Sequence, residues 1–400
     1  MRDLDIKLED VFSEDNLKKA IRHTVKRSAS PGVDGLESKD LPKYWENYRS
    51  SVMGEILNGT YTPTPLRVFF KSKPGKKEKR QIGVYSNLDQ MLQRCILYEF
   101  ERYFVPLFHL RSYGFIKEHN TYQAVSRCIG YMNDGYEWVA DADIRKCFDT
   151  IKHKLLLRVL ETHKIDARLI KLIAEFIKVP GMAGDRIVYN RIGVPQGSCL
   201  SPIFANIVLD KLDWFLDKDR IRFVRYADDL VMFFDSKREA EAALVSVNTF
   251  LKDKLSLSLN VEKTSVVYAD ELEYLGFGFK KCTNSYFPTL NDHIKRKMCK
   301  KLDHYLNDIG SDPDKYMSGI GAFNRGWLEY YKPVAWEDMM GFLAEVDDIE
   351  DDAILTKLAR DAITPNHILK YALKTNKYVG LSDLYRDIKE RRPGYDEQIL

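Results

Sequence analysis

Two adjacent carboxylates at a predicted tight turn are the residues of this chain best suited to chemistry. Asp228 and Asp229 lie between the runs 221–225 and 230–234, whose apolar residues predict the two strands of a hairpin. Neighbouring carboxylates with little local base favour the hard cation Mg²⁺, and Mg²⁺ implies phosphate chemistry. An isolated Asp-Asp pair is more often only a polar turn, so the prediction depends on the rest of the chain.

A second strand, predicted at 138–143, presents acids at alternate positions before a helical segment. Asp141 and Asp143 would share one face of this strand. One acid from this strand and one from the hairpin are the minimum set that can hold two Mg²⁺ ions side by side. One ion would activate an attacking hydroxyl and the other would steady a leaving pyrophosphate. The predicted reaction is therefore nucleotidyl transfer.

Two further segments carry residues that suit nucleotide binding. The loop at 193–202 contains glycines that let the backbone approach a ligand, and the amide of Gln196 can lie against a nucleotide or a template sugar. An apolar helix is predicted after it, at 203–212.

The run 71–80 holds six bases in ten residues around a Pro-Gly pair, which predicts a basic hairpin. A solvated basic loop is the alternative for this run.

Read together, these segments resemble the bacterial reverse transcriptases of the group II intron-like family. The resemblance is carried by residues 143–148, by VPQGSCLSP at 194–202 and by RYADD at 225–229. Further segments match the family in the same order: SPGVDG at 30–35, the basic block at 71–83, SYGF at 112–115, LNVEKT at 259–264 and YLGF at 274–277. Many ordered blocks are far more specific than a single motif.

The resemblance implies an α+β chain with the right-hand polymerase fold, in which fingers, an antiparallel-sheet palm and a helical thumb surround the active site. The implied activity is RNA-directed DNA polymerase, with an RNA template, dNTPs as substrates and a DNA product. The expected segments are an N-terminal extension at 1–60, fingers and palm at 61–285, a thumb at 286–340 and a C-terminal helical segment at 341–400.

The resemblance also assigns metal-binding residues. Asp143, Asp228 and Asp229 match the acids that bind two Mg²⁺ ions, for which Mn²⁺ is an alternative, and the Ile144 carbonyl would lie close to a metal. Lys263 lies where such polymerases carry a lysine that can protonate pyrophosphate as a general acid. The leucines at 255, 257 and 259 predict a strand before it. By residue type alone, Lys263 is a surface lysine.

The remaining carried-over residues contact the substrate. Phe148 matches the bulky gate that excludes a ribose 2′-hydroxyl, and Gln196 matches a contact to the incoming nucleotide. Lys71, Lys73 and Arg80 fall in the basic hairpin that would close over the triphosphate, where fixed cations stabilise the leaving group. Arg80 has the better match to the family, since the loop is one residue longer than the usual pattern.

A basic helix is predicted at 293–306. Its apolar residues recur at helical spacing, so one face would pack on the protein while the other meets phosphate along a template–primer duplex. The bases on that second face are Lys295, Arg296, Lys297, Lys300 and Lys301. A face that only keeps a core helix soluble is the alternative.

Composition bounds the remaining possibilities. The 400 residues are 44% hydrophobic and 30% charged, and a net charge of +3 means that nucleic acid must be held by local patches. The six cysteines lack zinc spacing, which predicts free thiols in a reducing compartment. No apolar leader or membrane-spanning run is present, so a cytoplasmic protein without membrane contact is expected.

The segment 336–361 departs from the family pattern. It holds nine acids and two bases, whereas an intron maturase would extend a basic surface here, and an acidic face repels phosphate. The leading hypothesis is therefore a reverse transcriptase that works with a dedicated noncoding RNA in antiphage defence. A group II intron reverse transcriptase with maturase activity and an RNA-binding scaffold without catalysis are the alternatives. The acidic segment could also be a solvated helix, or contact a protein partner or a second copy of the chain.

Overall fold

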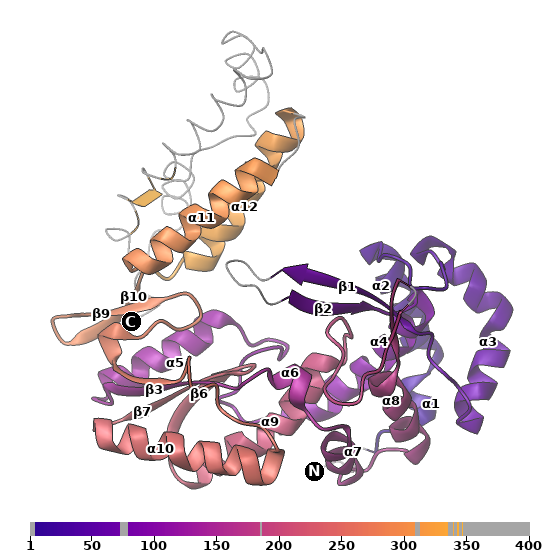
Figure 1. The fold of residues 1–400 in the computed structure, drawn as a ribbon, viewed down its shortest axis with the longest axis horizontal. Helices are drawn as coiled ribbons and strands as arrows, with labels where there is room; N and C mark the ends of the chain where they lie inside the picture. Colours follow the sequence, from indigo (N-terminus) through magenta and orange to yellow (C-terminus); the bar gives the residue numbers. More distant parts are fainter. Residues whose placement is uncertain are drawn as a thin grey trace. The chain divides into compact units, whose positions relative to one another are not determined.

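The computed structural model describes residues 5–72, 79–184, 186–308 and 313–334, together with Met339, Phe342, Leu343 and Val346. Helices and mostly antiparallel strands occur together, as the α+β prediction requires (Figure 1). The helices are α1 (Leu8–Val11), α2 (Glu14–Arg27), α3 (Leu41–Asn58), α4 (Asn87–Phe104), α5 (Thr121–Asn133), α6 (Cys147–Thr150), α7 (His153–Glu161), α8 (Ala167–Lys178), α9 (Ser201–Lys218), α10 (Lys237–Phe250), α11 (Asp292–Asp308) and α12 (Pro313–Tyr331). The strands are β1 (Leu66–Ser72), β2 (Lys79–Val84), β3 (Trp138–Asp143), β4 (Gly181–Ala183), β5 (Arg186–Val188), β6 (Arg222–Tyr226), β7 (Asp229–Phe234), β8 (Ser265–Tyr268), β9 (Gly278–Cys282) and β10 (Ser285–Thr289).

The chain folds into two compact units. The first contains the residues up to Ala124 and the segment Trp138–Val266, and the second contains Val125–Glu137 and the described residues from Val267 onward. The four segments predicted from the sequence follow different boundaries and remain a prediction. No helix in the described part of the chain combines the length and the apolar composition that a membrane span requires.

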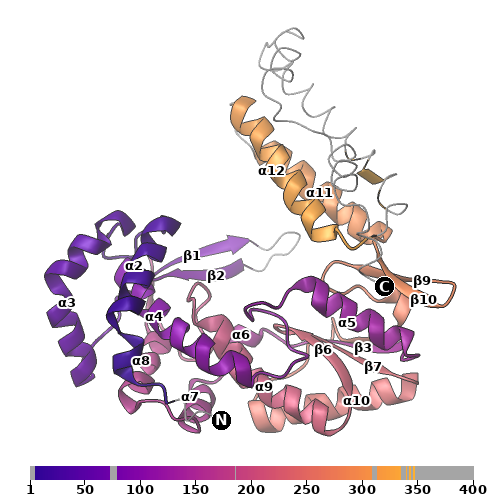
Figure 2. The same ribbon diagram turned by 180° about the vertical axis from the view of Figure 1, so that it is seen from behind.

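An antiparallel sheet in the first unit carries the predicted acids. The strands β6 and β7 form a hairpin around the turn at 227–228, and β3 lies on the other side of β7. The side chains of Val139, Val224 and Val231 are fully buried, which anchors all three strands. The helix α10 packs along β3 and β7, and α9 packs against β6 (Figure 2). The predicted hairpin and the predicted strand at 138–143 are therefore both present.

A second sheet of the first unit has the strand order β2-β1-β4-β5. The strands β1 and β2 form the predicted antiparallel hairpin, in which Lys71 lies opposite Arg80. The short strand β4 pairs in parallel with the start of β1. A hydrogen bond from the Gly83 backbone N–H to the Gln196 carbonyl (2.8 Å) joins this sheet to the loop before α9. The sheet is thus fixed to the loop that carries the predicted nucleotide contact.

One local prediction is wrong. The leucines at 255, 257 and 259 do not form a strand, because α10 continues through a π-helical turn over Leu251–Leu255. Leu251 and Leu255 are both fully buried, so they pack as neighbours on one helix face rather than along a strand. Ser256 then adopts the left-handed conformation and ends the helix. Only Leu259 makes a bridge to another segment, at Ile144.

The second unit contains the hairpin of β9 and β10 and the helices α11 and α12. The apolar face predicted for α11 is buried at Ile294, Met298 and Leu302. Tyr330 of α12 stacks on Phe277 with ring centroids 5.5 Å apart. The basic helix predicted at 293–306 is therefore present and packs on its apolar side.

Candidate active site

The acidic residues meet at the ends of paired strands. Asp143 is the last residue of β3 and lies directly opposite Asp229, the first residue of β7. Asp228 occupies the turn before β7, and the left-handed conformation of Ala227 (φ 59°) gives this turn its tight shape. Asp141 lies two residues before Asp143, on the same face of β3. The fold thus gathers carboxylates that are more than 80 residues apart in the chain.

The gathered carboxylates repel one another. Desolvation, together with the charges of Asp229 and Asp143, raises the pKa of Asp141 to about 7. Desolvation and the charges of Asp228 and Asp143 raise the pKa of Asp229 to about 6. In both carboxyls burial is the largest cause of the raised pKa and the neighbouring carboxylates add to it, and a bound cation would offset both effects by stabilising the charged forms.

The chemistry of this donor set fits a divalent metal ion. The donors are carboxylate oxygens, which Mg²⁺ and Mn²⁺ prefer over nitrogen or sulfur. Within the described residues, no three acidic, histidine or cysteine side chains are arranged to enclose a metal ion by themselves. A Mg²⁺ ion in such a site takes its remaining oxygens from water and substrate phosphates. The buried Ile144 lines the same cleft.

Lys263 binds directly to the acidic cluster. Its Nζ lies 2.6 Å from Oδ1 of Asp143, and the Asn260 side-chain amide donates to Oδ2 of the same carboxylate at 3.0 Å. The Asn260 backbone N–H also donates to the Asp143 carbonyl (2.8 Å). The hydrogen bond to Asp143, with the carboxylate charge, raises the pKa of Lys263, so the ammonium form is the one present. The predicted general acid therefore carries its proton at the cluster.

A cleft of about 1200 Å³ opens in front of these residues. Phe148 lies half-buried in its wall, with its ring edge-on to Phe115 at 6.3 Å. Gln196 also lines the cleft and donates a hydrogen bond from its side-chain amide to Asp149 (2.8 Å). Gly197 adopts φ +122°, and a Cβ there would lie 2.1 Å from the Gly83 carbonyl oxygen, so this close approach requires glycine. Phe148 and Gln196 thus share one cavity with Asp143, Asp228 and Lys263.

The other predicted residues lie elsewhere. Lys71 is exposed on β1, Arg80 belongs to β2, and Lys73 lies outside the described residues. The five bases of the predicted duplex-binding helix all lie on α11 of the second unit. Four of them are exposed, while Lys295 is half-buried with its Nζ 5.7 Å from the centroid of the Phe342 ring. The segment 336–361 is described only at isolated residues, so its predicted role is left open.

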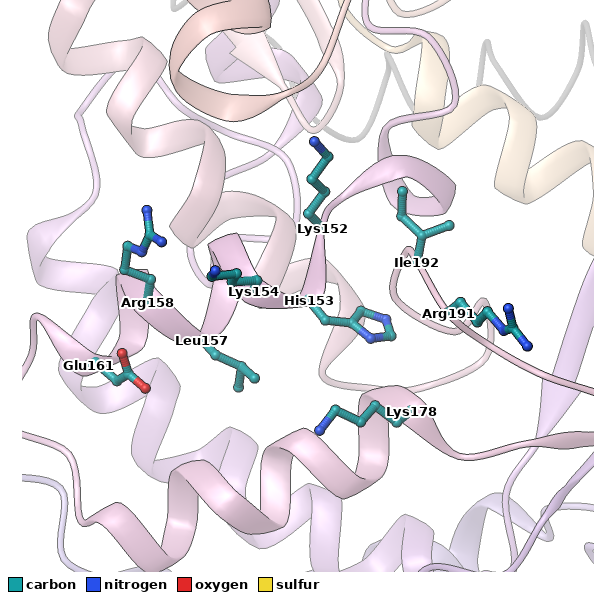
Figure 3. Close-up of a pocket in the computed structure, with 9 residues that line it drawn as sticks. All are labelled: Lys152, His153, Lys154, Leu157, Arg158, Glu161, Lys178, Arg191 and Ile192. Carbon is teal, nitrogen blue, oxygen red and sulfur yellow. The ribbon is translucent and has the colours of Figure 1, made fainter.

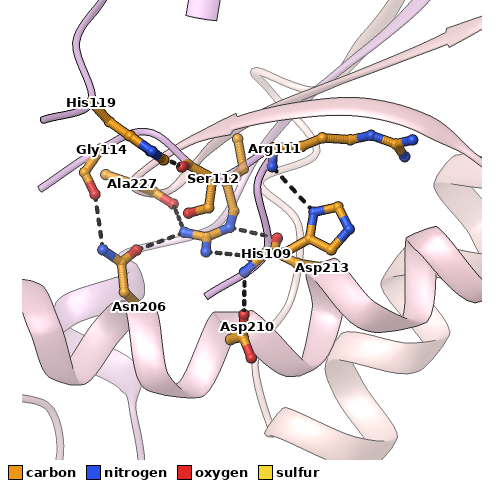
Figure 4. A network of polar contacts seen from close by, with 10 residues as sticks. His109, Arg111, Ser112, Gly114, His119, Asn206, Asp210, Asp213 and Ala227 are labelled. Carbon is orange, nitrogen blue, oxygen red and sulfur yellow. Dashed lines mark hydrogen bonds and ion pairs between the residues drawn. The ribbon is translucent and has the colours of Figure 1, made fainter. Parts of the chain in front are cut away.

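A buried ion pair supports the acidic turn. Arg225 is fully buried and forms a bidentate pair with Asp213 of α9, at 2.7 Å and 2.5 Å. Figure 4 labels its partners Asp213, Asn206 and Ala227. Its remaining terminal nitrogen donates to the Asn206 side-chain oxygen (2.8 Å) and to the Ala227 carbonyl (2.9 Å). Asn206 in turn donates to the Gly114 carbonyl (2.8 Å), and a Cβ on Gly114 would lie 2.3 Å from the Ala227 nitrogen. The acidic turn is therefore held by the hydrogen bond from Arg225 to the Ala227 carbonyl and by the close packing of Gly114 against the Ala227 nitrogen.

Two residues of this site were not predicted from the sequence. Arg225 stands directly before the turn, but an arginine on a predicted strand looks like a surface residue, and its buried partner Asp213 lies 12 residues away. Asn260 contacts Asp143 from 117 residues away. Its position in the same short block as Lys263 is the signal that could have identified it.

Comparison with known proteins agrees with this geometry. A family model described as reverse transcriptase (RNA-dependent DNA polymerase) matches residues 71–279. Protein YkfC of Escherichia coli is 28% identical over 296 residues, covering 64% of this chain and 77% of YkfC. The group II intron-encoded protein LtrA of Lactococcus lactis is 28% identical over 202 residues, covering 50% of this chain and 32% of LtrA. The putative COX1/OXI3 intron 1 protein of Saccharomyces cerevisiae is 24% identical over 308 residues, covering 62% of this chain and 36% of that protein.

The chain thus spans only about a third of the length of the two intron proteins. The matched family region contains the whole acidic cluster and every residue that lines the cleft in front of it except Leu66. Because the family model covers more than half of the 400 residues, the chain belongs to the reverse transcriptase (RNA-dependent DNA polymerase) family, and the predicted group II intron-like reverse transcriptase is confirmed.

Proposed function

We propose that this protein extends a DNA strand on an RNA template by nucleotidyl transfer from dNTPs. The observation that carries the proposal is the single cleft in which Asp143, Asp228 and Lys263 lie together with Phe148 and Gln196. We assign the sheet of β3, β6 and β7 to the palm, the β1–β2 hairpin to the fingers, and α11 with α12 to the thumb.

Asp143, Asp228 and Asp229 are the residues that would hold Mg²⁺, together with the Ile144 carbonyl. When bound, two such ions supply activation of the primer hydroxyl and neutralise charge on the leaving pyrophosphate. Lys263 supplies a proton at its Nζ, close to the same carboxylates. Phe148 and Gln196 orient the sugar and the base of the incoming nucleotide. Lys71, Lys73 and Arg80 would face the triphosphate.

Primer extension on an RNA template tests the proposal. The wild-type protein, with Mg²⁺ and dNTPs, extends a DNA primer, and Asp228→Asn combined with Asp229→Asn abolishes extension. Asp219→Asn, an exposed carboxylate at the end of α9, is the control and keeps wild-type extension. Extension by the double variant at the wild-type rate would refute the assigned site. A wild-type protein that binds RNA but never extends a primer would favour the scaffold alternative.

The biological role follows from the RNA that the protein uses. The acidic composition of 336–361 supports a dedicated noncoding RNA and a role in antiphage defence, because an acidic surface does not suit a large intron RNA. The intron-encoded relatives support the alternative, a group II intron reverse transcriptase and maturase. Sequencing the nucleic acid that copurifies with the protein separates the two. Intron sequence flanking the gene contradicts the defence role, and a short structured RNA contradicts the intron role.

A further inference from the structure

A second cavity lies on α7 and α8, outside the acidic cleft (Figure 3). Its volume is about 780 Å³. The side chains around it come from the whole length of α7 and the residue before it, from the end of α8 and from the loop before Gly193 (Figure 3). Its basic residues are Lys152, Lys154, Arg158, Lys178 and Arg191. Glu161 is the one acidic residue in its lining, so the pocket carries a strong excess of positive charge.

This positive charge is not neutralised by the described part of the protein. None of the five bases forms an ion pair with a carboxylate among the residues that the structure describes, and all five are exposed. Arg168 on the same helix α8 shows the contrast, because it pairs with Asp166 (2.6 Å) and Glu9 (2.7 Å). Exposed cations that form no ion pair with the described residues and surround a concave surface attract an anionic ligand.

The loop that forms one wall of the pocket is held in place. The buried His153 donates from Nε2 to the Gly193 carbonyl (2.7 Å), and the Gly193 N–H donates to the Ile151 carbonyl (2.8 Å). The Asn190 side chain donates to the Ile177 carbonyl at the end of α8 (2.8 Å). Arg191 and Ile192 between these anchors are exposed, so they are presented on a fixed backbone.

Exposed apolar surface for a base lies in the pocket lining and in the chain just before it. Ile192 in the lining is 46% exposed, and Tyr189, two residues before Arg191, is 67% exposed. Exposed aromatic and apolar side chains next to a row of cations are the combination that binds single-stranded nucleic acid, since nucleobases stack on the rings while phosphates meet the cations. Ile192 also lines the acidic cleft, so the two cavities share a wall. A strand that lies in the cleft can therefore continue to the pocket.

We propose that this pocket binds single-stranded RNA that extends beyond the catalytic cleft. The phosphates lie among Lys154, Arg158, Lys178 and Arg191, and a base packs on Tyr189. The proposal rests on the proposed function in its choice of RNA over DNA. Binding is measured without dNTPs, so its outcome is separate from whether the protein synthesises DNA.

The test compares two probes by fluorescence anisotropy. One is a blunt RNA–DNA duplex, and the other is the same duplex with a single-stranded RNA overhang. The pocket variant replaces Lys154, Arg158, Lys178 and Arg191 with Gln. The control variant makes the same change of charge at four exposed bases away from both cavities: Lys218, Arg238, Lys252 and Lys254.

The overhang increases the affinity of the wild-type protein and of the control variant. The pocket variant loses this gain, so its affinity for the overhang probe falls by about tenfold. Its slope of log affinity against log salt becomes shallower by about 0.7 for each phosphate that is no longer bound. Tyr189→Ala loses part of the gain with an unchanged salt slope, because stacking on a nucleobase involves no charge. Circular dichroism establishes that both charge variants are folded.

Three outcomes would overturn the proposal. The first is a pocket variant that keeps the full gain from the overhang. The second is an equal gain when the overhang is made double-stranded, which would assign the pocket to duplex. In the third, the overhang increases the affinity of none of the proteins, and binding of inorganic tripolyphosphate is lost only in the pocket variant. This result would assign the pocket to a small anion.

Discussion

Arg225 shows how a residue that never reaches the cleft can decide whether the cleft works. It is fully buried, its charge is matched by Asp213, and it donates to the carbonyl of Ala227 in the acidic turn. Removing one partner of a buried pair leaves the other charge uncompensated, which costs about 3–5 kcal/mol. We expect Arg225→Met to lower the free energy of unfolding by that amount in urea denaturation.

A double variant separates stability from positioning. Arg225→Met combined with Asp213→Leu removes both charges and recovers much of the stability. Primer extension stays low, because Asn206 and Ala227 still lack their donor and the turn is no longer fixed. Full recovery of extension in the double variant would show that Arg225 has only a structural role.

Phe148 gives a prediction about sugar selection. Its half-buried ring lies in the wall of the cleft, where it would block a ribose 2′-hydroxyl. We expect Phe148→Ala to incorporate rNTPs on an RNA template at a higher ratio to dNTPs than the wild type. Phe69→Ala, an exposed phenylalanine of β1 outside the cleft, serves as the control. An unchanged ratio in Phe148→Ala would make this residue part of the core packing and not a gate.

At this scale the sequence predicted the residues whose surroundings are local. Asp228 and Asp229 follow from the apolar runs on either side of a turn, and Asp143 follows from its place at a strand end. The partners Asn260 and Arg225 could not be derived in the same way. Their roles depend on which distant carboxylate lies beside them, and periodicity carries no information about pairs that are 117 residues apart.

At the scale of elements, the short apolar runs on either side of the turn were predicted correctly as strands, and the spaced leucines at 255, 257 and 259 were not. The hairpin of β6 and β7 is buried on both faces, since successive residues of each strand are buried, and a tight turn joins its paired strands. The leucines at 255, 257 and 259 fit a strand by spacing, but Leu251 and Leu255 also fit a helix four residues apart, and burial against the core decided between the two. The continuation of α10 therefore required tertiary packing that no local pattern encodes.

The helix α11 gives a prediction for this scale. Its exposed bases Lys297, Lys300 and Lys301 lie away from the buried face, whereas Lys295 lies over the Phe342 ring. Replacing the three exposed lysines with Gln should weaken binding to a blunt template–primer duplex of any sequence. The slope of log affinity against log salt should become shallower by about 0.9 for each phosphate that is released. Lys295→Gln is the matched control and should change the slope little, because that lysine packs on the protein.

Unchanged affinity and slope in the triple α11 variant would contradict the thumb assignment. The exposed face of α11 would then turn to solvent or to an acidic partner. The experiment uses the complete chain, so loss of folding is detected by circular dichroism before binding is measured.

For the whole molecule, charge is concentrated in patches while the total stays small. The net charge is only +3, yet five bases surround the pocket on α7 and α8 and four exposed bases lie on α11. The long-range field of such a protein is weak, so nucleic acid is held where these patches touch phosphate. We therefore expect a salt dependence much steeper than a charge of +3 suggests.

Combining the two patch variants tests whether the patches act on separate stretches of nucleic acid. The pocket belongs to the first unit and α11 to the second, and we assign single-stranded RNA to the former and the duplex to the latter. Sites without shared partners contribute additively to free energy. On a duplex with an RNA overhang, the decreases in log affinity and in salt slope for the combined variant should equal the sum of those for the pocket variant and the α11 variant. On a blunt duplex, the combined variant should match the α11 variant alone. A combined decrease on the overhang probe no larger than that of one variant would mean that both patches bind the same phosphates.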